Sequence, residues 1–174
     1  MDSLKIAFIG KICSGKTTAS NYIINKYFPN MKKLAFADKL KEIAVDLFDM
    51  KEKDRKLLQQ IGTAMRGINE NVFMNYLNKQ SKKYKYVCVE DGRFKNEIQA
   101  LKKNRFILVK LEISKELQLK RIKNTYPDTY KNHLDRLTHY SETQMDSINN
   151  SIYDMIINVD NDDLFKKIDK LLNI

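Results

Sequence analysis

The sequence predicts an α/β fold with five parallel strands in one sheet and helices on both of its faces. Short apolar runs alternate with stretches of helical spacing along the 174 residues. This alternation is typical of parallel sheets, because each crossover needs a helix to return the chain to the same end. The first apolar run leads into a glycine-rich turn and then directly into a helix. With two prolines, five glycines and no internal repeat, we expect a single domain covering residues 1–174.

The first part of the chain contains two strand–helix units. Lys5–Ile9 is predicted as a strand and Thr17–Tyr27 as a helix, because the apolar residues of the second segment recur at helical spacing. A brief strand is expected at Leu34–Phe36. The next helix has apolar positions up to Phe48 and begins at Asp38, whose carboxylate is placed to cap it.

A long helical pattern and two further strands occupy the middle of the chain. The pattern runs over Asp54–Gln80 and is broken near Gly67. Tyr84–Val89 and Phe106–Leu111 are apolar runs and are predicted as strands. A helix is expected over residues 114–122.

The last part of the chain completes the predicted sheet. A polar stretch over residues 124–137 interrupts the regular pattern and precedes a further helix. Met155–Val159 is predicted as the fifth strand and Leu164–Leu172 as a closing amphipathic helix.

The chain is basic, with a formal net charge of +10, and a basic surface attracts polyanions such as nucleic acid and nucleotide triphosphates. Its lysines are spread widely and form no single basic arm with interleaved aromatics. This distribution disfavours nucleic acid as the partner. A solvated basic surface and a groove for polyanions both stay open as explanations.

No apolar run approaches the roughly 18 residues that a membrane span needs. The N-terminus leads directly into the glycine motif without a signal-peptide cleavage site. We therefore expect a cytoplasmic protein, in the host cytoplasm if the source is viral. The two cysteines, Cys13 and Cys88, lack the spacing of a metal site and are interpreted as free thiols.

The segment Gly10–Thr17, GKICSGKT, matches the phosphate-binding pattern G-x-x-x-x-G-K-[ST] at every fixed position, between a predicted strand and a predicted helix. Backbone N–H groups and the helix N-terminus would surround phosphates. Lys16 would reach the β and γ phosphates, and Thr17 would offer its hydroxyl to Mg²⁺. The predicted ATP-binding residues of this loop are Gly10, Lys11, Ser14, Gly15, Lys16, Thr17 and Thr18.

A second polar motif follows the predicted strand Tyr84–Val89. Glu90 and Asp91 stand where that strand ends, and ligands bind at the carboxyl ends of strands in open α/β sheets. Asp91 could hold Mg²⁺ through water, and the planar fork of Arg93 suits a phosphate. A structural ion pair or a helix cap is the alternative interpretation of these residues.

Three further blocks resemble a known family. The segments FADKLK at 36–41, LQQIGTAMR at 58–66 and DGRFKNE at 91–97 look like the FADxLK, LLQxxGTxxR and DxRFxNE blocks of phage-type deoxynucleoside monophosphate kinases. With the phosphate loop before them and HYSE at 139–142 after them, the resemblance spans most of the chain in the family's order. It implies the three-layer fold of P-loop nucleoside monophosphate kinases. In that fold a substrate-binding helical region would cover about 38–80 and a mobile lid about 121–138.

The resemblance also implies roles for individual residues. Asp38 would lie near the bound monophosphate, Arg66 and Arg93 would hold its phosphate, and Asp91 would belong to the Mg²⁺ shell. Asp38 as a simple helix cap and Arg66 as a surface residue stay open as alternatives. Gly92 departs from the β-branched residue usual in the family and would loosen the turn that aims Arg93.

The predicted lid is rich in positive charge. Arg121, Lys123 and Arg136 flank the polar segment 124–137, so closure would bring them onto the phosphates and exclude water. Phosphoryl transfer requires in-line positioning and positive charge, with little demand for a covalent nucleophile. Arg121 is also expected to contact ATP, and Arg136 and Glu142 to contact the acceptor. Ordinary solvated charge is the alternative for the lid cations, and an N-terminal helix cap is the alternative for Glu142. The predicted catalytic residues are Lys16, Arg93, Arg121 and Arg136.

These observations predict a kinase that uses ATP and Mg²⁺ to phosphorylate a nucleoside monophosphate, a deoxynucleotide by the resemblance. A kinase of another small phosphate ester, similar to phosphomevalonate kinase, is one alternative. An ATP-regulated nucleic-acid-binding module is the other. His133 and His139 are isolated in the sequence and are assigned structural or surface roles. The resemblance also makes a homodimer a reasonable expectation.

Overall fold

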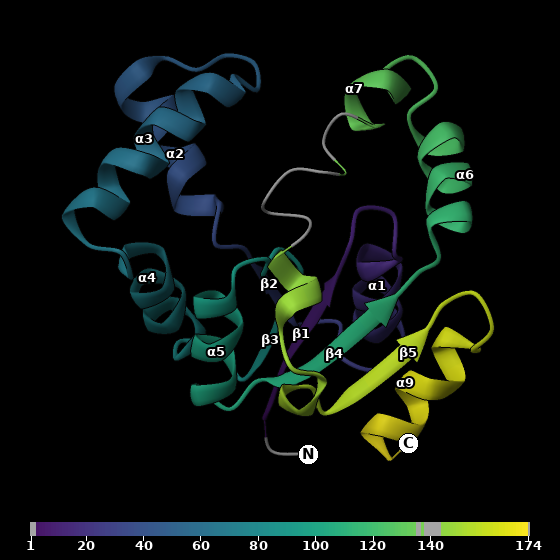
Figure 1. The fold of residues 1–174 in the computed structure, drawn as a ribbon. Helices are drawn as coiled ribbons and strands as arrows, with labels where there is room; N and C mark the ends of the chain where they lie inside the picture. The colour runs from purple at the N-terminus through teal and green to yellow at the C-terminus, as the bar shows by residue number, and fades with distance from the viewer. Residues whose placement is uncertain (1–2, 135–136, 138–143, 174) are drawn as a thin grey trace.

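A computed structural model describes residues 3–134, 137 and 144–173 of the chain (Figure 1). Its centre is a five-stranded sheet in the order β2-β3-β1-β4-β5, and every neighbouring pair of strands is parallel. The strands are β1 (Leu4–Gly10), β2 (Lys32–Leu34), β3 (Tyr86–Val89), β4 (Ile107–Glu112) and β5 (Met155–Asn158). Helices cover both faces of the sheet, which confirms the predicted fold class.

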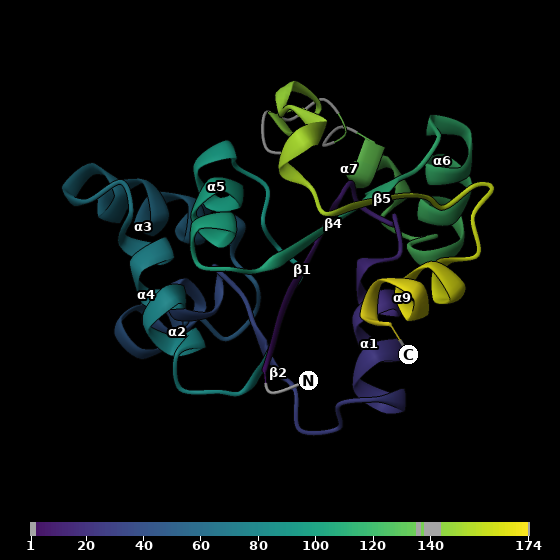
Figure 2. The same cartoon turned by 90° about the horizontal axis from the view of Figure 1, so that it is seen from below.

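Helices surround the sheet. They are α1 (Lys16–Lys26), α2 (Asp38–Phe48), α3 (Arg55–Ile68), α4 (Val72–Ser81), α5 (Lys95–Lys103), α6 (Lys115–Thr125), α7 (Tyr130–Leu134) and α9 (Leu164–Leu172). Two 3₁₀ turns, η1 (Gln144–Ser147) and η2 (Asn150–Ile152), precede β5. Figure 2 shows α1 and α9 side by side on one face of the sheet. Among the described residues, no helix has both the length and the apolar character needed to cross a membrane.

The central strand β1 is buried on both faces, as expected for a parallel sheet covered by two helical layers. Its successive side chains point to opposite faces. Ile6 and Phe8 pack among buried residues of α1 and α9, whereas Ala7 and Ile9 pack among buried residues of α4 and α5. Both sets are fully buried. The strand that leads into the phosphate loop is therefore held in the most rigid part of the fold.

Helix α5 was not predicted from the sequence. Its nine residues, KNEIQALKK, are mostly polar, and only Ile98 and Leu101 among its apolar residues are fully buried. Two buried positions are too few to give a clear helical period. The side chain of Glu97 is also buried, because it accepts backbone hydrogen bonds at the start of the helix.

The turn between β2 and α2 differs from the prediction. The strand lies at Lys32–Leu34 and ends before Phe36, because the N–H groups of Phe36 and Ala37 donate to the Asp91 carboxylate at 3.0 and 3.1 Å instead of to a strand. The predicted cap at Asp38 is wrong. Asp38 is the first residue of α2, and its Oδ2 accepts the N–H of Ala35 at 2.9 Å, which closes the preceding turn.

The long helical pattern is divided at the predicted place. Helix α3 ends at Ile68 and α4 begins at Val72, and Asp54 caps α3 by accepting the N–H of Leu57 at 3.0 Å. The further helix expected before β5 is represented, in the described residues, by the 3₁₀ turns η1 and η2.

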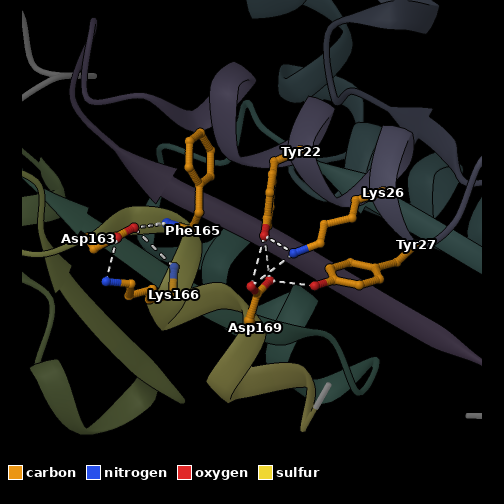
Figure 3. A network of polar contacts seen from close by, with 7 residues as sticks. All are labelled: Tyr22, Lys26, Tyr27, Asp163, Phe165, Lys166 and Asp169. Atoms are coloured by element: carbon orange, nitrogen blue, oxygen red, sulfur yellow. Dashed lines mark hydrogen bonds and ion pairs between the residues drawn. The ribbon is translucent and has the colours of Figure 1, made fainter.

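A polar network joins α9 to α1 (Figure 3). The carboxylate of Asp169 accepts the hydroxyls of Tyr22 and Tyr27 at 2.7 and 2.8 Å and the ammonium of Lys26 at 3.1 Å. The ring of Phe165 stacks on Tyr22 with centroids 4.3 Å apart. These contacts fasten the last helix to the helix that follows the phosphate loop.

The structure gives Gly92 a packing role that can be tested. A Cβ atom there would lie 3.0 Å from Cδ1 of Ile9 and 3.4 Å from Cδ1 of Leu101. The branched side chain of Gly92→Val should therefore overpack the core and lower the free energy of unfolding by about 1–3 kcal/mol. At Gly67, in α3, a Cβ would meet nothing within 4 Å. Gly67→Val should change stability by less than about 0.5 kcal/mol, and equal losses in denaturant titrations of both variants would refute the packing role.

Candidate active site

The phosphate loop joins β1 to α1 at the carboxyl edge of the sheet. Its backbone turns through two left-handed residues, Cys13 at φ 61° and Gly15 at φ 96°. A Cβ on Gly10 would lie 2.7 Å from the carbonyl oxygen of Leu111 and 2.6 Å from Oγ of Ser14. Position 10 therefore admits only glycine in this geometry.

The side chains of the loop are placed differently from one another. Nζ of Lys16 donates to the carbonyl oxygens of Gly10 and Lys11, both at 2.8 Å, so the ammonium lies across the loop. Lys11 pairs with Asp146 of η1 at 2.9 Å. Ser14 is fully buried, and within the described residues its hydroxyl has no hydrogen-bond partner. Lys16 is thus the charged side chain of the loop that lies where phosphates would bind.

Glu90 lies beside the threonine of the loop. Its Oε2 accepts the hydroxyl of Thr17 at 2.6 Å, and its Oε1 accepts the hydroxyl of Ser20 at 2.5 Å. Burial raises the pKa of Glu90, but hydrogen bonds from Lys33, Ser20 and Thr17 outweigh it and hold the pKa below its usual value. The carboxylate therefore stays ionised at neutral pH. Thr17 directs its proton toward Glu90 and keeps its oxygen lone pairs for a cation.

Asp91, the residue expected from the sequence to belong to the Mg²⁺ shell, is bound to the backbone that leads into α2. Both of its oxygens are engaged by the backbone N–H groups of Phe36 and Ala37. Burial raises its pKa, against the effect of these two hydrogen bonds. Asp91 ties the end of β3 to the start of α2. The carboxylate beside Thr17 is that of Glu90.

The turn that carries Arg93 is fixed by Glu97. Oε2 of Glu97 accepts the N–H groups of Arg93 at 3.0 Å and Phe94 at 3.2 Å. Since Glu97 is a buried residue, its carboxylate provides a fixed acceptor for both donors. Asp91 and Glu97, at the two ends of the DGRFKNE segment, thus both accept hydrogen bonds from backbone N–H groups. These bonds fix the turn that carries Arg93.

Positive charge gathers in a cleft of about 920 Å³, here called the cationic cleft. Its lining comes from α2 and α3 on one side and from α7 and the residues that connect it to α6 on the other; Figure 1 shows where these helices lie. Its charged lining residues are Lys16, Lys53, Arg55, Arg66 and Arg93. Partial burial, together with the charges of Arg55, Lys41 and Arg93, lowers the pKa of Lys53. Such mutual repulsion among cations is what an anion would relieve.

Uncharged residues and one histidine complete the cationic cleft. They are Ile12, Cys13, Thr17, Leu40, Leu58, Gln59, Tyr126, Thr129 and His133. The ring of His133 is only 8% exposed and stacks on Tyr126, with centroids 4.2 Å apart. Its Nδ1 has no hydrogen-bond partner among the described residues. His133 thus stacks on Tyr126, in line with the structural role expected for it, and also forms part of the cleft wall.

A second cleft, of about 570 Å³, lies on the other side of the phosphate loop. Its lining includes Thr18 and Phe165, the latter also part of the α1–α9 network. Nη1 of Arg121 donates to the carbonyl oxygen of Cys13 at 3.2 Å and lines this cleft. Both clefts share the residues Cys13, Lys16, Thr17 and Tyr126. We call this second space the loop cleft.

The predicted site residues are partly brought together. Lys16, Thr17, Arg66 and Arg93 line the cationic cleft, where Arg66 also lies over the rings of Phe73 and Phe94 at 5.0 and 5.7 Å. Asp38 does not line it, because it faces a separate groove between α2 and α4. Arg136 and Glu142 lie outside the described residues.

Several residues of the site were not found from the sequence. Lys53 and Arg55 belong to the charged connection before α3, where no periodic pattern distinguishes a binding residue from a solvated one. Gln59 lies within the LQQIGTAMR block, in which the resemblance assigns a role to Arg66 alone. Glu90 was considered with Asp91, and the sequence holds no signal that assigns one of two adjacent carboxylates to the loop.

Comparison with known proteins identifies the fold. Neither a protein-family model nor a curated protein matches the sequence. The structure is similar to an uncharacterized protein from Eubacterium ventriosum (TM-score 0.62, 16% identity, covering 98% of this chain and 96% of that one). It is also similar to the shikimate kinase from Bacteroides thetaiotaomicron (TM-score 0.60, 12% identity, covering 98% and 99%).

A third similar structure is the shikimate kinase from Acinetobacter baumannii in complex with shikimate (TM-score 0.58, 17% identity, covering 99% of this chain and 93% of that one). At these identities the likeness shows the fold alone, which the chain shares with these three proteins.

The role of Glu97 predicts a difference between two substitutions. Glu97→Ala removes the side-chain acceptor of the Arg93 and Phe94 N–H groups and should lower the free energy of unfolding by about 1–3 kcal/mol. Glu97→Gln keeps an acceptor oxygen and should cost less. Unfolding of both variants in denaturant measures the difference, and equal losses would refute the role of the carboxylate oxygen.

The native chain and Glu97→Gln should also differ in how their free energies of unfolding, measured in denaturant, depend on pH. Burial raises the pKa of Glu97 in the folded state, so folding favours its protonated form. Stability of the native chain relative to Glu97→Gln should therefore decrease as pH rises from the ordinary glutamate pKa to the raised one.

Proposed function

We propose that this chain is a kinase that transfers the γ-phosphoryl group of ATP to a nucleoside monophosphate and forms the diphosphate. The observation that carries the proposal is the cationic cleft, in which Lys16 of the phosphate loop is joined by four further positive side chains. The similarity of the fold to shikimate kinases supports phosphoryl transfer to a small acceptor. The acceptor class rests on the charge of the cleft and on the family resemblance of three sequence blocks.

The charge of the cleft favours an acceptor that is itself phosphorylated. An alcohol acceptor must lose a proton during transfer and needs a base to receive it. A phosphate monoester presents an oxygen that is already ionised near neutral pH, so its principal need is charge neutralisation. Arg66 and Arg93 offer planar guanidinium groups that suit phosphate oxygens.

ATP is assigned to the loop cleft, with its phosphates on the loop that separates the two spaces. The N-terminus of α1 and the backbone of residues 11–16 supply donors and positive potential there. Lys16 would neutralise charge at the transferring group, which lies between donor and acceptor. Because Lys16 and Thr17 line both clefts, they are placed to contact both substrates.

The donor set beside the loop fits a magnesium ion. Thr17 would provide its hydroxyl oxygen, and Glu90 would orient that hydroxyl and balance the charge. When bound, the ion would neutralise phosphate charge during transfer. The last turn of α6 from Arg121 and helix α7, together with Arg136, belong to the proposed lid over residues about 121–138. Deoxyribose as the sugar follows from the family resemblance alone.

The function is tested by ADP release from ATP and Mg²⁺ with each common ribo- and deoxynucleoside monophosphate. Shikimate, phosphomevalonate and a reaction without acceptor complete the panel. Turnover that requires one or a few monophosphates would support the proposal and name the base. Turnover only with another acceptor, or ATP-dependent oligonucleotide binding without any turnover, would refute it.

Substitutions of two residues test the assignment of the transferring site. Lys16→Ala and Arg93→Ala should each reduce kcat/KM by about a hundredfold or more, because each removes positive charge from the transferring phosphate. Arg105→Ala is the control, since Arg105 precedes β4 at the opposite edge of the sheet. Thermal unfolding checks that each variant is folded, and turnover near that of the native chain in Lys16→Ala or Arg93→Ala would contradict the roles.

A further inference from the structure

A lysine from the edge strand of the sheet reaches the carboxylate beside the phosphate loop. Lys33 lies on β2 and pairs with Cys88 of β3. Cys88 is two residues before Glu90 in the sequence. Nζ of Lys33 is 2.5 Å from Oε1 of Glu90 and donates to Oδ1 of Asn21 on α1 at 2.8 Å. The ammonium is therefore held between α1 and the end of β3.

Glu90 is surrounded by donors on both of its oxygens. Oε2 accepts from Thr17, while Oε1 accepts from Ser20 and pairs with Lys33. Thr17 and Ser20 are neutral donors, so Lys33 supplies the full positive charge in this set. The side chain of Glu90 is 20% exposed and that of Lys33 39%, which leaves the ion pair only partly screened by solvent.

A divalent cation held by Thr17 would enter a place where the carboxylate charge is already balanced. The ion and the ammonium are both positive and would share the single charge of Glu90, so each weakens the hold of the other. At the same time, Lys33 keeps Oε1 occupied and leaves Oε2 directed at Thr17. The geometry supports two linked effects, orientation of the carboxylate and competition for its charge.

We propose that Lys33 is a positioning residue that balances the charge of Glu90 before a divalent cation binds and thereby raises the cation concentration that the nucleotide site requires. The inference rests on the proposed function in one respect, the assignment of the cation that accompanies ATP to Thr17 and Glu90. It does not depend on which acceptor is phosphorylated.

The test measures cation binding without turnover. Mn²⁺ is titrated into the full chain with the β,γ-imido analogue of ATP, and free Mn²⁺ is followed by electron paramagnetic resonance. Lys33→Gln should bind Mn²⁺ about two- to fivefold more tightly than the native chain, the range expected for loss of one partly exposed charge pair. Lys33→Arg keeps the charge and should stay close to the native value.

Lys32→Gln is the matched control, because it removes the same charge from the adjacent, exposed residue of β2. It should leave Mn²⁺ binding unchanged. In a Glu90→Gln background, Lys33→Gln should lose its effect, since the charge for which the two cations compete is gone. Thermal unfolding establishes that each variant is folded, and Lys33→Met carries the same test if Lys33→Gln does not fold.

The outcomes separate this inference from the proposed function. Unchanged or weaker Mn²⁺ binding in Lys33→Gln, with normal binding in the native chain, would overturn the role of Lys33 alone. Equal tightening in Lys32→Gln would also overturn it, because a general charge effect would then suffice. Failure of the native chain to bind Mn²⁺ with the nucleotide would overturn the proposed function and this inference together.

Discussion

The site depends on the alternation of side chains at the end of β3. Successive residues of an extended backbone point to opposite faces, and Cys88 and Val89 already pack into the two different cores. Glu90 continues on the face of Cys88 and meets the phosphate loop and α1. Asp91 continues on the face of Val89 and meets the start of α2. One strand end thus joins the loop to the segment that begins the helical region.

Through this arrangement, one short segment after β3 supports residues of both clefts. The bonds of Asp91 fix the β2–α2 turn, and those of Glu97 fix the backbone around Arg93. Arg93 therefore rests on the same short segment that holds Thr17 through Glu90. A cationic cleft built on such a support keeps its positive groups close despite their repulsion, and a bound anion would add to the stability of the folded state.

Much of the fold could be predicted from the sequence, because strong local patterns encode it. The phosphate loop follows a buried strand, and apolar runs mark β1, β3, β4 and β5, whereas β2 at Lys32–Leu34 begins two residues before the predicted run Leu34–Phe36. Helix α5 was missed because it buries only Ile98 and Leu101 among its apolar residues. In the site, Lys16, Arg66 and Arg93 could be found from motifs. That Glu90 and not Asp91 lies beside Thr17 depends on which face of β3 carries α1, and the positions of Lys53 and Lys33 depend on tertiary neighbours that no spacing reveals.

The network that fastens α9 to α1 also bears on how the chain acquires its structure. Tyr22 and its acceptor Asp169 are separated by 147 positions, and contacts so distant in sequence form late and slow the search for the native state. The phosphate loop is synthesised early, yet the helix behind it is clamped only after β5 and α9 have emerged from the ribosome. Nascent chains of this protein would therefore carry the loop motif well before they carry a finished nucleotide site.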